Sequence, residues 1–381
     1  MITQEQLNEI AYALGDNFEK VNIKYITLMA DHLSKIGELS ADDVHLLNQL
    51  AKYGVNVKKI NKEFAHELNI TLDQMDKLYD KIAKDSYETV SEYYRINGVT
   101  QVPLEENKLL NDYVNSMKIL TAGTFTNLAK TTVMSQSYKN AVDEAIRMVS
   151  TGASNYKDQI DNLIMKEVSN GMRVQYASGL TRRLDSAARM NVLDGVRQMN
   201  IGVNSRIGEQ FGSDGVEVSV HALCALDHIP VQGRQYSKKE WAQVSAGLDR
   251  QIGELNCHHF LFPIILGVSE PTYSDSELKK MNDLAQKKIT VNGKTMTRYE
   301  ASQYMRRTET AMRGTKEKIL SAREIGNAKL EQHYTNLLKK QSGLYANITK
   351  QSGLTPRWER STIPEFNAKP TLNETKLIKN K

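Results

Sequence analysis

Apolar residues recur at helical spacing through most of this chain, and strand signals gather in one stretch, residues 216–296. Residues 104–211 follow helical spacing in long segments, and a capping-box pattern at Thr297 opens the longest helical run. Between them Val216-Glu-Val-Ser-Val220 alternates apolar and polar residues, as a half-buried strand does. The pattern predicts a predominantly helical α+β fold, with a small core module that holds a short sheet and a hairpin.

The core module carries further local signals. Residues 233–237 predict a second short strand, and Ser237-x-x-Glu240 has the form of a capping box that opens a helix. Asn292-Gly293 supplies the positive φ angles of a type I′ turn, so residues 289–296 predict a hairpin.

The first hundred residues predict a series of short helices. Capping-box patterns at Thr3, Asp16 and Thr71 mark helix starts, and glycines mark helix ends and later breaks. These glycines are Gly15, Gly37, Gly54 and Gly98, followed by Gly123, Gly152, Gly171 and Gly202.

Five segments are expected along the chain. They are a helical docking region at 1–100, a helical connector at 101–170, the α+β core module at 171–297, one long helix at 298–342 and an extended basic arm at 343–381. The arm holds seven Lys or Arg against three Asp or Glu, and three prolines interrupt it. We expect it to become ordered only against a partner.

Composition excludes several classes of protein. With 40% hydrophobic and 25% charged residues, the 381-residue chain is too apolar for wholesale disorder. No apolar run approaches the ~18 residues of a membrane span, and we expect neither a signal peptide nor a membrane partner. Two cysteines make no disulfide framework, which favours assembly in a reducing compartment. The net charge of +5 is compatible with a polyanion but identifies none.

Both cysteines and four of the eight histidines fall between residues 221 and 259. His221, His228, Cys257 and His259 would suit tetrahedral zinc, with Cys224 and His258 in reserve. Their spacing matches no common zinc motif, so a second interpretation stays open. In it the histidines are buried and hydrogen-bonded, and Cys257 packs as a small apolar residue.

A catalytic interpretation is the weaker one. Cys257 would be the nucleophile, His221 or His228 the base, and Asp227 the group that orients the base. A metal-dependent hydrolase would need a carboxylate such as Asp227 or Glu254. Common hydrolase, phosphate-loop and dinucleotide motifs are missing from the sequence, and we expect no enzyme.

Three arginines stand among apolar residues in the segment 181–197. Arg182, Arg189 and Arg197 could form a stripe that binds phosphate or an acidic partner. The competing interpretation is the solvated edge of an amphipathic helix.

The order of landmarks in the core module resembles that of the phage minor capsid protein family, which is related to the Mu-type phage head morphogenesis proteins. The landmarks are Val218-Ser-Val-His221-Ala-Leu-Cys-Ala-Leu-Asp-His228-Ile-Pro-Val-Gln232-Gly233, then Asn256-Cys257-His258-His259, then Gly267-Val-Ser-Glu270, and finally Arg298-Tyr-Glu-Ala-Ser-Gln303. The chain departs from the family pattern at Ala225, Val231 and His258, where the family usually has arginine, tryptophan and arginine. These departures weaken any chemistry that relies on the two arginines.

The resemblance implies a non-enzymatic virion structural protein present in few copies. Such a protein would act in head assembly at the portal vertex or the capsid interior, after assembly in the bacterial cytoplasm. Its expected partners are the portal protein, the major capsid protein and packaged DNA. The resemblance also narrows the metal set to His221, His228, Cys257 and His259, with zinc in a structural role. A virion-borne zinc- or cysteine-dependent hydrolase and a DNA-binding head protein remain the competing functions.

Overall fold

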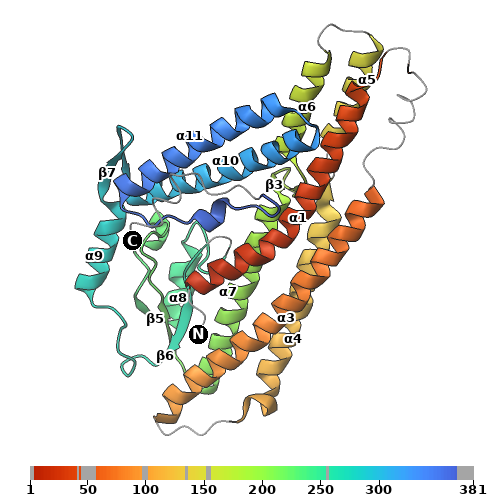
Figure 1. The fold of residues 1–381 in the computed structure, drawn as a ribbon. Helices are drawn as coiled ribbons and strands as arrows, with labels where there is room; N and C mark the ends of the chain where they lie inside the picture. Colours follow the sequence, from red (N-terminus) through yellow and green to blue (C-terminus); the bar gives the residue numbers. More distant parts are fainter. Residues whose placement is uncertain are drawn as a thin grey trace. The chain divides into compact units, whose positions relative to one another are not determined.

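A computed structural model describes residues 4–40, 43, 57–96, 102–133, 136–151, 156–254 and 257–366 (Figure 1). The chain forms two compact units, each assembled from three separate stretches. The first unit comprises Met1–Leu14, Ile70–Thr126 and Arg189–Ser302, and the second comprises Gly15–Asn69, Asn127–Ala188 and Gln303–Lys381.

Within the described residues, helices dominate and the strands are short, so the predicted α+β class is confirmed. The helices are α1 Gln4–Gly37, α3 Val57–Ile96, α4 Lys108–Thr131, α5 Gln136–Ser150, α6 Tyr156–Asn170, α7 Leu184–Gln210, α8 Lys238–Ala246, α9 Asp275–Gln286, α10 Arg298–Glu324 and α11 Ala328–Ser352. Short 3₁₀ turns are η1 Leu104–Glu106, η2 Leu226–His228 and η3 Trp358–Ser361. The strands are β1 Thr132–Val133, β2 Arg173–Gln175, β3 Thr181–Arg183, β4 Gly215–Val218, β5 Gln235–Ser237, β6 Leu261–Ile264, β7 Lys288–Val291 and β8 Lys294–Thr297.

The N-terminal helices are longer than predicted. Helix α1 passes through Gly15 and Asp16 without a break, and α3 passes through Thr71 in the same way. The predicted helix end at Gly15 and the predicted starts at Asp16 and Thr71 are wrong. Thr71 is fully buried, and Leu14 and Phe18 on either side of Asp16 are buried along a continuous helical face, which overrides local capping preference. Gly123 and Gly202 also lie inside helices, α4 and α7, rather than at breaks. The patterns at Thr3, Gly54, Gly98 and Gly152 fall outside the described residues.

The second unit packs around the buried faces of its helices. The rings of Phe18 and Phe64 meet edge to face with centroids 5.7 Å apart, and Tyr138 donates to or accepts from Nδ1 of buried His32 at 2.6 Å. Helices α5 and α6 pack against each other. Gly171 ends α6 with φ of +53°, as predicted, and leads into the antiparallel sheet β1-β2-β3.

The region predicted as one long helix at 298–342 forms two helices. Helix α10 ends at Glu324, and the left-handed residue Gly326 precedes the break. The side chain of Asn327 then caps α11 by accepting from the Leu330 N–H at 3.0 Å. The two helices lie side by side in Figure 1, and the Tyr345 hydroxyl donates to Glu309 at 2.7 Å between them.

The region predicted to be an extended arm differs from that prediction up to residue 366. Helix α11 runs through Gly343 to Ser352 and ends at the left-handed Gly353. Beyond it the chain packs back on the same helices: Tyr345 accepts from the Arg357 N–H, and its ring meets that of Trp358 with centroids 4.7 Å apart. The prediction was based on the excess of basic residues and on the prolines, and it missed the aromatic contacts that pack these residues against α11. Residues 367–381 lie outside the described residues.

The first unit holds the strands, hairpin and helix predicted within residues 216–297, whereas residues 171–188 of the predicted core module belong to the second unit. Its sheet has the order β5-β4-β6, with both neighbours antiparallel to β4. The β7–β8 hairpin turns at Asn292 and Gly293, both with positive φ, which confirms the predicted type of turn. The capping boxes at Ser237 and Thr297 are confirmed as well, with reciprocal hydrogen bonds to Glu240 and Glu300. In the described part of the chain, every helix is too short or too polar to cross a lipid bilayer.

Candidate functional site

The central β4 strand places two chain segments of the first unit beside each other. Turn η2 follows β4 and carries His228, and the residues that lead into β6 carry Cys257 and His259. Gly233 returns the chain from this turn to β5 by donating its N–H to Val218 O at 2.7 Å. Its φ is +68°, and a Cβ atom there would overlap the side chains of Leu278 and Val220, so glycine is required.

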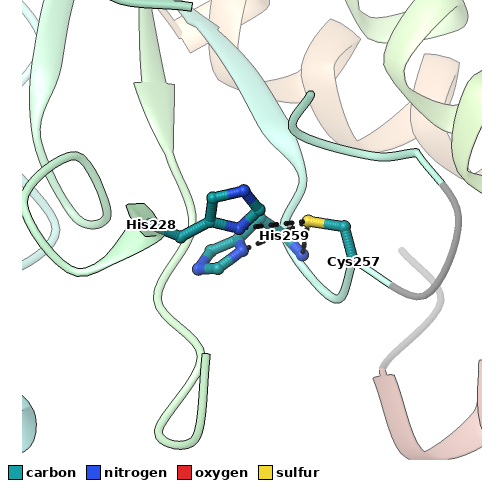
Figure 2. A group of neighbouring side chains, drawn as sticks. All are labelled: His228, Cys257 and His259. Carbon is teal, nitrogen blue, oxygen red and sulfur yellow. Dashed lines mark hydrogen bonds between the residues drawn. The ribbon is translucent and has the colours of Figure 1, made fainter. Parts of the chain in front are cut away.

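His228, Cys257 and His259 form a buried cluster (Figure 2). The Sγ atom of Cys257 lies 3.3 Å from Nδ1 of His259 and 3.7 Å from Nδ1 of His228. One ligand atom from each of the three residues lies within 4.8 Å of the others. These three side chains therefore point their ligand atoms toward one common point, where a metal ion could bind.

Each histidine of the cluster has its outer nitrogen held by a fixed acceptor. Nε2 of His228 lies 2.9 Å from the Arg250 carbonyl oxygen, and Nε2 of His259 lies 3.0 Å from Oε1 of Gln232. The Gln232 amide is itself oriented, because Oε1 accepts from the His221 N–H at 2.8 Å and Nε2 donates to Asn282 at 2.6 Å. Its oxygen thus faces His259, and both histidines donate from Nε2.

The electrostatics of the two thiols differ sharply. Burial raises the pKa of Cys257, but hydrogen bonds with His228 and His259 outweigh that effect and lower its pKa to about 5. Burial opposes protonation of His228, yet its contacts with Cys257 and the Arg250 carbonyl raise its pKa. By contrast, burial raises the pKa of Cys224 to about 12. Cys257, and not Cys224, is therefore the cysteine that readily ionises to a thiolate.

The structure does not bring His221 into the three-residue cluster. Its ring stacks on His258 with centroids 4.6 Å apart, and its Nδ1 accepts from the Leu223 N–H at 3.2 Å. Cys224 is buried, and it lies outside the cluster.

The two carboxylates considered as bases are placed differently. Asp227 Oδ2 lies 3.6 Å from Nε2 of His228, on the side away from Cys257, where it can orient the ring. Glu254 is exposed, and its backbone carbonyl accepts from the Cys257 N–H at 2.9 Å.

The structure places the three arginines considered as a binding stripe in three different settings. Arg182 is exposed on β3 in the second unit, outside helix α7. Arg189 lies over the Tyr12 ring at 4.7 Å, and Arg197 is fully buried with its guanidinium 3.4 Å from Nδ1 of His258. The sequence pattern suggested one helix for all three, but the helix begins only at Leu184.

Comparison with known protein families gives one decisive match. The model of the family described as phage minor capsid protein 2 matches residues 2–348. The chain belongs to the phage minor capsid protein 2 family. No curated protein matches it, and no solved structure does. The suspected resemblance is confirmed, and the chain is a phage virion structural protein.

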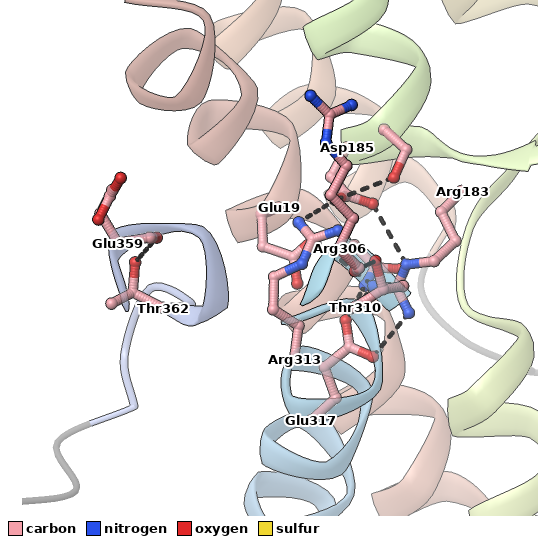
Figure 3. A network of polar contacts seen from close by, with 11 residues as sticks. Glu19, Arg183, Asp185, Arg306, Thr310, Arg313, Glu317, Glu359 and Thr362 are labelled. Carbon is pink, nitrogen blue, oxygen red and sulfur yellow. Dashed lines mark hydrogen bonds and ion pairs between the residues drawn. The ribbon is translucent and has the colours of Figure 1, made fainter. Parts of the chain in front are cut away.

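This minor capsid protein also buries an ion network in its second unit, which the sequence analysis missed (Figure 3). Arg183 binds Glu317 through both terminal nitrogens, one of them at 2.8 Å, and its Nε donates to Asp185 at 3.2 Å. Arg313 binds the other oxygen of Asp185, and Glu19 lies 3.6 Å from Arg183. These residues come from α1, β3, α7 and α10, so no local pattern announces the network.

Charge balance explains the state of Glu19 in the minor capsid protein. The carboxylates of Glu19, Asp185 and Glu317 crowd around the guanidinium groups of Arg183 and Arg313. Burial raises the pKa of Glu19 well above its ordinary value, and the negative charges of Asp185 and Glu317 raise it further. Both effects favour the protonated form of Glu19 in the folded chain.

Proposed function

We propose that this chain is a non-enzymatic minor head protein, built into the virion in few copies, that acts in head assembly at the portal vertex or the capsid interior. The observation that carries the proposal is the family match over residues 2–348, which includes stretches of both compact units. The proposed partners are the portal protein and the major capsid protein. Assembly with them takes place in the cytoplasm of the bacterial host before DNA fills the head.

The burial of the Cys–His cluster supports a structural role. Only 9% of the Cys257 surface and 1% of the His259 surface are exposed, so a substrate carbonyl has little access to the thiol. A cysteine nucleophile has to reach the substrate as well as ionise.

Mass spectrometry of purified virions, joined to chemical cross-linking, tests the proposal. We expect the chain in virions at a small fraction of the major capsid protein, with cross-links to portal or major capsid protein. A head that lacks the chain, or cross-links confined to non-head proteins, would overturn the proposal. A Leu109→Glu variant tests whether this apolar residue contacts a head protein, because 72% of the Leu109 surface is exposed.

A cysteine-dependent hydrolase is the second candidate, favoured by one observation. The Cys257 thiol has a low pKa and lies 3.3 Å from a histidine nitrogen, the arrangement of an activated nucleophile. Rapid alkylation of Cys257 in the folded chain, abolished in His259→Ala, would favour this candidate. Burial of the thiol predicts slow alkylation instead.

DNA binding by the same head protein is tested through salt dependence. Binding that falls steeply between low and moderate salt would support phosphate contacts, since each neutralised phosphate releases counterions. A DNA affinity that does not change with salt would argue against DNA binding and in favour of contacts with head proteins.

A further inference from the structure

The hydrogen bonds around the His228–Cys257–His259 cluster fix where its lone pairs point. Because Nε2 of His228 donates to the Arg250 carbonyl, the neutral ring presents an unprotonated Nδ1 to Cys257. Gln232 imposes the same tautomer on His259, whose Nδ1 also faces Cys257. Sγ and the two Nδ1 atoms therefore converge with a single proton available to the three of them.

A metal ion can bind the sulfur and both nitrogen lone pairs, which one shared proton cannot do. That proton, on Sγ or on one Nδ1, bridges one Sγ–Nδ1 pair and leaves the other Nδ1 lone pair facing sulfur inside a buried site. A metal ion accepts all three donors at once. The outer hydrogen bonds to a carbonyl and an amide oxygen are those that metal-bound histidines usually make.

The distances suit zinc. Zinc–sulfur and zinc–nitrogen bonds of about 2.3 and 2.05 Å at a tetrahedral angle place sulfur and nitrogen about 3.6 Å apart. The two Sγ–Nδ1 distances, 3.3 and 3.7 Å, lie on either side of that value. One thiolate with two imidazoles favours zinc or cobalt over magnesium or calcium, which prefer oxygen ligands.

We propose that Nδ1 of His228, Sγ of Cys257 and Nδ1 of His259 bind one zinc ion, which clamps η2 to the chain that enters β6. Water completes the coordination, and His221 stays outside because its Nδ1 is held by the Leu223 N–H. The clamp joins residues 29 positions apart, one in the turn between β4 and β5 and one in the chain that enters β6. Zinc binding at this cluster does not depend on where the protein sits in the virion.

Metal titration of the purified full-length chain tests the proposal. After treatment with a chelator, we expect the chain to bind one equivalent of zinc, and cobalt to give a thiolate charge-transfer absorption band. Cys257→Ser should abolish the band, while His228→Ala and His259→Ala should weaken binding more than 100-fold. His221→Ala and Cys224→Ser are matched controls that should retain the stoichiometry and the band.

A gentler variant guards against loss of folding. Gln232→Ala keeps all three proposed ligands and removes the acceptor for His259 Nε2, together with the Gln232 hydrogen bonds to the His221 N–H and Asn282, so zinc should still bind, about 10–100-fold more weakly. Circular dichroism should show the helical content unchanged in this variant. Failure of the folded wild-type chain to bind zinc or cobalt would overturn the proposal. So would a cobalt band that survives Cys257→Ser or disappears in Cys224→Ser.

Discussion

Arg183 and Glu317 face each other through paired hydrogen bonds in the interior of the second unit, although 134 residues separate them in the sequence. The Glu317 side chain is fully buried and that of Arg183 is 16% exposed. Asn22 donates to the same Glu317 carboxylate at 3.1 Å. The pair therefore joins β3, α1 and α10, and its loss would leave charge in a dry site.

We predict that Arg183→Met lowers the free energy of unfolding by about 3–5 kcal/mol, because three carboxylates would then face one arginine. Urea denaturation followed by circular dichroism measures the change. Lys35→Met is the matched control: it breaks the exposed pair with Asp31 in the same unit and should change stability by less than about 1 kcal/mol. Equal effects of the two variants would contradict the structural role of the network.

The raised pKa of Glu19 predicts a pH dependence of stability. In the unfolded chain the pKa of this carboxyl returns to its ordinary value of 4.5. The folded state therefore holds the proton more tightly, and the stability that this supplies is complete below about pH 4.5 and is lost as pH rises through the folded pKa. Glu19→Gln imitates the protonated acid, so the variant should overtake the wild type in stability as pH rises.

Urea midpoints measured at intervals from about pH 4.5 to 8 check the Glu19 prediction. Glu105→Gln, which removes one exposed carboxylate, is the control for loss of a single charge and should follow the wild type. A constant difference between wild type and Glu19→Gln at every pH would show that Glu19 does not exchange a proton on unfolding.

Two glycines inside helices predict opposite effects of alanine. A Cβ atom at Gly202 would overlap the hydroxyl end of Tyr113, which is fixed by its hydrogen bond to Gln198 and by Arg206 over its ring. Gly202→Ala should therefore destabilise the chain by about 1–3 kcal/mol. Gly123 has no heavy atom within 4 Å of such a Cβ, so Gly123→Ala should stabilise α4 by up to about 1 kcal/mol.

Thermal unfolding of both glycine variants gives the measurement. Tyr113→Phe combined with Gly202→Ala should recover part of the lost stability, since the hydroxyl is the nearest obstacle. A stabilising Gly202→Ala would mean that Tyr113 moves aside freely.

Removal of the proposed zinc should lower stability in a cysteine-dependent manner. With free zinc at about 100 times its dissociation constant, binding adds about 2.7 kcal/mol, which a strong chelator removes. We expect the chelator to lower the unfolding midpoint of the wild type and of Cys224→Ser. It should leave Cys257→Ser unchanged. A chelator effect that persists in Cys257→Ser would assign the metal to another place in the chain.

Local chemistry accounts for what could be predicted from the sequence. The Asn292–Gly293 turn and the capping boxes at Ser237 and Thr297 depend on residues within three positions of each other, and the structure has all of them. The pattern at Asp16 has the same form but lies within α1, because burial of that helix outweighs the local preference.

In the candidate site, too, part could be predicted from the sequence and part depends on tertiary packing. The clustering of Cys257 with His228 and His259 was visible as a concentration of rare residues in the sequence. The exclusion of His221 was not, since it depends on stacking against His258 and on a backbone donor. The Arg183–Glu317 pair had no sequence signal at all, because its partners meet only when β3 and α10 pack.

The chain between Gly353 and Phe366 has a mechanical consequence. Lys316 donates to the Ser361 carbonyl at 2.9 Å, and the side chains of Lys316 and Arg323 lie over the Phe366 ring. A pull on the chain beyond Phe366 is thus resisted first by cations on α10 rather than by the end of α11. Tension applied there would be carried by α10, and single-molecule pulling on Lys316→Met should show a lower force at the first rupture.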